Sequence, residues 1–107
     1  MSDVDLCIVN ARVVTPTGTI AGGGVAVRGG LITQVGISES LPSAARTIDA
    51  RGAYLLPGLI EPHAHLGLSS TEGARNLEKW RHDFRSETEG AIHGGVTTVL
   101  SHWTGSE

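Results

Sequence analysis

The chain has 107 residues, a formal net charge of −3 and no block of basic residues, so it is long enough for one small domain and poorly suited to nucleic acid. Hydrophobic residues make up 39% and charged residues 18%, which is a globular rather than a disordered composition. No apolar run reaches the roughly 18 residues of a membrane helix, the acidic start is unlike a signal peptide, and a single cysteine excludes an internal disulfide. We therefore expect a cytoplasmic protein that binds neither membranes nor nucleic acid.

Short apolar runs separated by turn signals predict β-strands in residues 4–36. Residues 15–18, Thr-Pro-Thr-Gly, form one turn signal, and the Gly-Gly pair at residues 29–30 is typical of a two-residue hairpin. Residues 10–12 are expected to break the first apolar run. The strands should form an antiparallel meander that is half of a small β-sandwich, with Cys7 as a small buried hydrophobe.

The following segment is more polar and then returns to short strands. Residues 37–46 are small or polar and predict a loop, whereas residues 47–50 and 54–56 predict two short strands. The Pro-Gly pair at residues 57–58 then interrupts the pattern. We place a domain boundary there, with a small β-sandwich domain over residues 1–56.

Beyond the boundary the pattern predicts strand, helix, strand. Residues 59–66 form an apolar strand that carries two histidines, and residues 76–93 place apolar side chains on one face at spacings of three and four. Glycines at residues 94–95 suit a left-handed helix cap. Residues 96–100 are β-branched and apolar, as in a buried parallel strand. This order is one βαβ unit.

The most informative motif is His63-Ala64-His65. Side chains at positions i and i+2 of a strand share a face, with Cα atoms about 6.5–7 Å apart, so two imidazoles can reach one zinc ion. The pair lies at the carboxyl end of a strand that opens a βαβ unit, where α/β folds bind ligands. Two surface or hydrogen-bonded histidines are the alternative for the tripeptide alone. In its context, the motif predicts metal ligands.

Several segments resemble the amidohydrolase superfamily. Residues 57–66, Pro-Gly-Leu-Ile-Glu-Pro-His-Ala-His-Leu, resemble its first barrel strand. Residues 10–14 and the hairpin at residues 29–30 resemble its N-terminal β-domain. Residues 83–88 and 91–99 resemble the first helix and second strand of hydantoinases, dihydropyrimidinases and allantoinases. The resemblance covers nearly the whole chain, in the same order.

The resemblance implies a mixed β and α/β fold, in which half of a β-sandwich is followed over residues 57–107 by the first βαβ unit of a truncated, metal-dependent (β/α)8 TIM barrel. It also implies one or two divalent metals, usually zinc, with His63 and His65 on the more buried one. Metal-activated water would then attack a small amide or imide substrate. The full-length protein is expected to be a homo-oligomer.

Relatives of this kind are several times longer, and their other metal ligands and catalytic aspartate come from later strands. We therefore expect no catalytic residue in this chain and no activity from its 107 residues alone. The chain would be the N-terminal part of a hydrolase of cyclic C–N bonds. The alternatives are a non-catalytic dihydropyrimidinase-related assembly protein, one chain of a split enzyme, or a free-standing β-domain that binds a partner.

Two further residues are expected near the histidine pair. Glu61 stands where most relatives carry aspartate, and its strand parity points it toward the same site, where it would orient a ligand or add a ligand oxygen. His102 follows the second strand and could line the site, a plain loop histidine being the alternative. Residues 69–71 predict a loop, and Arg75 beside it is a candidate contact for an anionic substrate.

Overall fold

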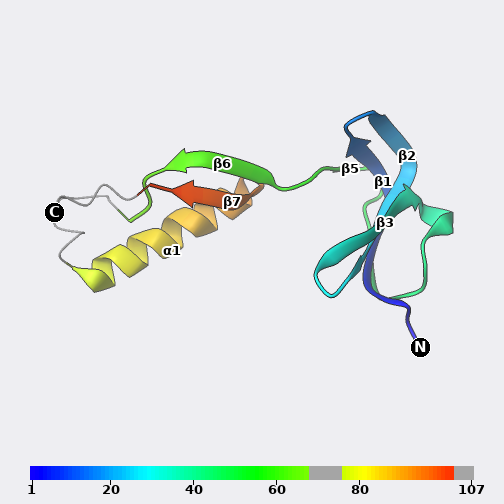
Figure 1. Ribbon diagram of the computed structural model, residues 1–107, viewed down its shortest axis with the longest axis horizontal. Helices are drawn as coiled ribbons and strands as arrows, with labels where there is room; N and C mark the ends of the chain where they lie inside the picture. The colour runs from blue at the N-terminus through cyan, green and yellow to red at the C-terminus, as the bar shows by residue number, and fades with distance from the viewer. Residues whose placement is uncertain (68–75, 103–107) are drawn as a thin grey trace. The chain divides into compact units, whose positions relative to one another are not determined.

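The computed structural model describes residues 1–67 and 76–102 (Figure 1). The described part of the chain is mostly β-strand with one α-helix. It divides into two compact units, Met1–Leu56 and Pro57–Glu107. No helix in the described ranges is long and apolar enough to cross a membrane.

The first unit is a mixed five-stranded sheet. Its strands are β1 (Val4–Thr15), β2 (Gly18–Arg28), β3 (Leu31–Ile37), β4 (Ala44–Asp49) and β5 (Tyr54–Leu55), with a short 3-10 turn, η1 (Ser38–Ser40), after β3. The order is β3-β2-β1-β4, with β5 also paired to β1. The β1-β2-β3 meander is antiparallel, as predicted, and its hairpin turn has Gly29 at φ 59° and Gly30 at φ 78°.

Two predictions about the strands around β1 are corrected by the structure. The first concerns residues 37–46, predicted to be a loop: β4 already begins there, at Ala44, and it runs parallel to β1, as does β5. The expected break at residues 10–12 is a β-bulge inside one long strand, because the register shifts between Ile8 and Ala11 while pairing continues. Asn10 adopts φ 56° there, and its N–H donates to Ser38 Oγ at 2.8 Å. The Ser38 hydroxyl thus accepts the hydrogen bond that a carbonyl of a neighbouring strand would otherwise accept from Asn10.

The core of the first unit is built from small apolar side chains. Two buried clusters form it, one of Val4, Cys7 and Ala26 and the other of Ala11, Val13 and Val25. Cys7 is 2% exposed, which confirms the prediction of a buried small hydrophobe. Ala11 and Ala26 are 0% exposed, so a larger side chain at either position would have to displace the residues packed around it.

The second unit is the predicted strand, helix, strand unit. It consists of β6 (Leu59–Ala64), α1 (Leu77–His93) and β7 (Val96–Ser101), with β6 and β7 parallel (Figure 1). Asn76 caps α1 by accepting a hydrogen bond from the N–H of Lys79 at 3.0 Å. At the other end Gly95 has φ 85°, the left-handed conformation that the glycine pair predicted.

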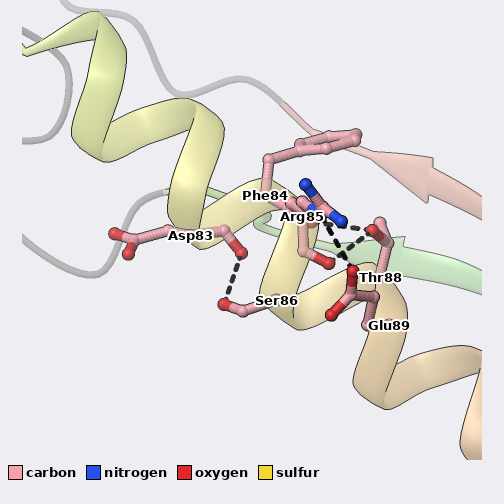
Figure 2. A network of polar contacts seen from close by, with 6 residues as sticks. All are labelled: Asp83, Phe84, Arg85, Ser86, Thr88 and Glu89. Atoms are coloured by element: carbon pink, nitrogen blue, oxygen red, sulfur yellow. Dashed lines mark hydrogen bonds and ion pairs between the residues drawn. The ribbon is translucent and has the colours of Figure 1, made fainter.

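The middle of α1 carries polar contacts within the helix itself (Figure 2). Arg85 Nε donates to Glu89 Oε1 at 2.9 Å, one turn further along the helix. This carboxylate raises the pKa of Arg85 above its usual value, through the hydrogen bond first and the charge attraction second. Thr88 Oγ1 donates to the Phe84 and Arg85 carbonyls, each at 2.9 Å. These local contacts support the helix rather than a site.

β6 and β7 have the apolar composition of buried barrel strands, but several of their apolar residues are exposed in this structure. Leu59 is 57% exposed, Ile60 is 64% exposed and Leu100 is 50% exposed. A two-stranded sheet with a single helix against it cannot cover both strand faces, so apolar residues with the composition of an inner strand lie open. A mostly apolar groove of about 300 Å³ also remains where α1 meets the strands, beside Phe84 and Val99.

Candidate metal centre

His63 and His65 point toward each other at the end of β6. Their Nε2 atoms are 3.2 Å apart, and their rings meet edge to face with an interplanar angle of 63°. Two nitrogens bound to one tetrahedral zinc at ~2.0–2.1 Å are themselves about 3.3 Å apart. The spacing of the two Nε2 atoms therefore fits two corners of one zinc coordination shell.

A bulge in β6 shapes this approach. Glu61 pairs with Val99 and Ala64 pairs with Ser101, so three steps along β6 match two steps along β7. The N–H of His63 is satisfied by Glu61, whose Oε1 accepts it at 3.0 Å. His65 is the first residue beyond the strand. The sequence prediction assumed a regular strand, whereas the rings converge from a bent one.

This contact also shows where the Glu61 side chain goes. Its carboxylate accepts a hydrogen bond from the backbone N–H of His63, two residues later in the chain. We expected either a hydrogen bond that orients a ligand or an added ligand oxygen. In this structure the Glu61 carboxylate contacts the backbone of His63. Glu61 therefore affects the position of this candidate ligand through the main chain.

His102, just past β7, lies beside the histidine pair. Its ring stacks on that of His63, with centroids 4.3 Å apart and an interplanar angle of 26°. Its carbonyl oxygen lies 3.1 Å from His65 Nδ1, and its N–H donates to the Ala64 carbonyl at 2.8 Å. Three imidazoles thus gather at the carboxyl ends of two adjacent parallel strands.

The turn that follows His65 is held by α1. The N–H of Gly67 donates to Glu87 Oε2 at 2.7 Å. Gly67 has φ 73°, and a Cβ built on it would come within 2.7 Å of the Trp80 indole, so only glycine fits. Trp80 in turn stacks on Phe84, with ring centroids 5.2 Å apart. Sequence reasoning missed Gly67 and Glu87, since neither forms a motif.

The gathered residues are not a complete metal site. Within residues 1–67 and 76–102, no group of three or more His, Cys, Asp or Glu side chains is placed to hold a metal ion. His63 and His65 supply two nitrogens, and any further ligands would come from elsewhere. The predicted loop at residues 69–71 and Arg75 lie outside the described residues.

Comparisons with known proteins find relatives among dihydroorotases, allantoinases and hydantoinases. No protein-family model matches the chain. It is 35% identical over 97 residues to a dihydroorotase from Trichlorobacter lovleyi, and 38% identical over 104 residues to an allantoinase from Streptomyces avermitilis. These alignments cover 90% and 94% of this chain but 21% of each relative.

The solved structures agree with these sequence relatives. An L-hydantoinase (dihydropyrimidinase) from Arthrobacter aurescens superimposes with a TM-score of 0.69 and 27% identity. That match covers 92% of this chain and 20% of the other. The chain therefore spans about a fifth of the length of the proteins it matches.

Proposed function

Because the chain is a homologue of the N-terminal portion of hydantoinase-like enzymes of the amidohydrolase superfamily, we propose that it carries the first metal-binding strand of a zinc-dependent hydrolase that opens small cyclic amides at a C–N bond. In this proposal residues 1–56 belong to the β-sandwich domain. Residues 57–107 are the start of the TIM barrel, with β6 and β7 as the first two of its eight strands.

The observation that carries the proposal is the 3.2 Å separation of His63 Nε2 and His65 Nε2. Both nitrogens would bind the metal. When bound, the metal would supply a Lewis acid that activates water and polarises the substrate carbonyl. The location supports the same assignment, because the carboxyl ends of barrel strands are where such enzymes bind substrate.

In this proposal, neighbouring groups hold the two imidazoles in position. Glu61 fixes the backbone of His63, and the His102 carbonyl fixes the ring of His65. Groups of this kind set the orientation and basicity of a metal ligand. We assign no proton-transferring residue to this chain. That role, together with the other ligands, would belong to later parts of a longer protein.

Zinc content tests the proposal in a longer protein that contains this chain together with the later barrel strands, because these 107 residues supply only two ligand nitrogens among the described residues. We expect zinc to be retained by the wild-type protein and lost in His63→Ala. His82→Ala is the matched control, because His82 is an exposed histidine of α1 whose side chain is 82% accessible. Hydrolysis of a panel of cyclic amides by this longer protein should follow the zinc content. A folded, zinc-free wild-type protein from zinc-replete cells would instead support a non-catalytic, assembly-type relative.

A further inference from the structure

His102 contacts every residue from Pro62 to His65. Its N–H donates to the Ala64 carbonyl at 2.8 Å, its carbonyl faces His65 Nδ1 at 3.1 Å, and its ring covers His63. A longer contact of 3.4 Å joins its Nε2 to the Pro62 carbonyl. A loop histidine with no role in the site would not be expected to make contacts with four consecutive residues at the end of β6.

The carbonyl contact determines which nitrogen of His65 is free. A carbonyl oxygen can only accept, so His65 Nδ1 must carry the proton in this contact. In the neutral ring the lone pair then lies on Nε2, which faces His63. The same logic makes His63 Nε2 the donor between the two rings when no cation is bound.

The ring contact argues against His102 as a third ligand. The lone pairs of an imidazole lie in the ring plane, and the rings of His63 and His102 are stacked at 4.3 Å with planes only 26° apart. Lone pairs of nearly parallel rings run side by side rather than converge. The His65 and His102 rings are further apart, with centroids at 6.2 Å. His102 is therefore placed to limit the orientation of His63, not to share its ion.

We propose that His102 is a positioning residue for the His63–His65 pair, acting through ring stacking on His63 and through its backbone carbonyl on His65. This role rests on the proposed function, since the pair is taken as the metal-binding element. It makes β7 a part of the site although β7 supplies no ligand. The stacking requires a flat ring at position 102 but no ring nitrogen.

Two substitutions separate this role from ligation and from simple packing. His102→Ala removes the ring and should weaken zinc binding by about 10-fold, the scale typical of groups that hold ligands. His102→Phe keeps a flat ring and should restore affinity to within about twofold of wild type. His93→Ala, an exposed histidine at the end of α1, is the control and should bind zinc as wild type does. An alanine variant with wild-type affinity, or a folded phenylalanine variant as weak as alanine, would overturn the proposal.

Nuclear magnetic resonance of the metal-free protein gives a second readout. The ring protons of His63 should shift in His102→Ala and keep a ring-current shift in His102→Phe. The His65 tautomer, protonated on Nδ1, should persist in both variants because the backbone carbonyl remains. If the wild-type protein binds no zinc, the proposed function fails, while these chemical shifts still test whether the His102 ring stacks on His63. Unchanged His63 shifts in His102→Ala would refute the proposed stacking.

Discussion

Residues 1–56 and residues 57–107 differ in what they bury. Six apolar residues are buried in the described part of the chain, and all of them lie in the first unit: Val4, Cys7, Ala11, Val13, Val25 and Ala26. In the second unit Leu59, Ile60 and Leu100 of β6 and β7 are half exposed or more, while three imidazoles are in contact. Substitutions in the first unit should therefore change stability, and those in the second should mainly change metal binding.

This contrast follows from how each unit is paired. β1 has a neighbour along both of its edges, so its apolar residues are covered from several directions. β6 and β7 pair only with each other among the described strands. Their exposed side chains lie on this short sheet, and the three histidines lie at or just past its carboxyl end. A site built there depends on local hydrogen bonds rather than on a packed core.

The largest expected effect is on the core of the first unit. Ala26→Leu places three extra carbons at a fully buried position of β2, and overpacking of this kind costs about 1–3 kcal/mol. Ala21→Leu is the matched control, since Ala21 lies on the same strand and is exposed. Urea unfolding should show a lower midpoint for the first variant only. Equal midpoints would contradict the assignment of the core.

A smaller effect is expected at the start of α1. Asn76→Ala removes the side-chain oxygen that accepts the Lys79 N–H and should cost about 1 kcal/mol of helix stability. Asn76→Ser retains a capping oxygen and should recover most of the loss. Far-ultraviolet circular dichroism during thermal unfolding measures both. Loss of sheet signal before helix signal in the alanine variant would count against the separation of the two units.

At Glu61 the account predicts a change in zinc affinity with little change in stability. Glu61→Ala removes the acceptor of the His63 N–H and should weaken zinc binding by up to about 10-fold. Glu61→Gln keeps a side-chain oxygen and should bind nearly as well as the wild type. Competition with a zinc chelator provides the measurement. A glutamine variant as weak as alanine would show that the carboxylate charge, not the hydrogen bond, is what matters.

The smallest effect concerns acid sensitivity of the first unit. The Arg51 N–H and then the Asn10 amide lower the pKa of Asp49 below its ordinary 3.8. The stability that the carboxylate contributes is present above pH 3.8 and is lost as the pH falls through the lower folded pKa. Asp49→Asn should show a smaller drop in urea midpoint over this range than the wild type. Parallel acid curves would contradict this prediction.

Local patterns predicted the elements better than their pairing. Apolar periodicity and turn residues located β1 to β3, the α1 helix and its glycine cap, because these depend on neighbouring residues. The parallel pairing of β4 with β1, and the bulge at Asn10, depend on contacts distant in sequence. The composition of β6 and β7 is typical of buried strands, but how far they are covered depends on neighbouring elements and not on composition.

The candidate site was predictable only in its central motif. The spacing of His63 and His65 follows from strand geometry, and their role as metal ligands stays a prediction. The approach of the two rings from a bulged strand could not be foreseen, because the bulge depends on how β6 pairs with the distant strand β7. The stacking of His102 depends on where β7 ends relative to β6.

X-ray absorption at the zinc edge tests the central claim most directly. The spectrum of the zinc-loaded protein should contain the outer-shell scattering of at least two imidazoles with nitrogens at about 2.0 Å. His63→Ala and His65→Ala should each remove one imidazole, and His102→Phe should remove none. Bound zinc whose imidazole scattering is unchanged in both alanine variants would contradict the claim that these two rings share one ion.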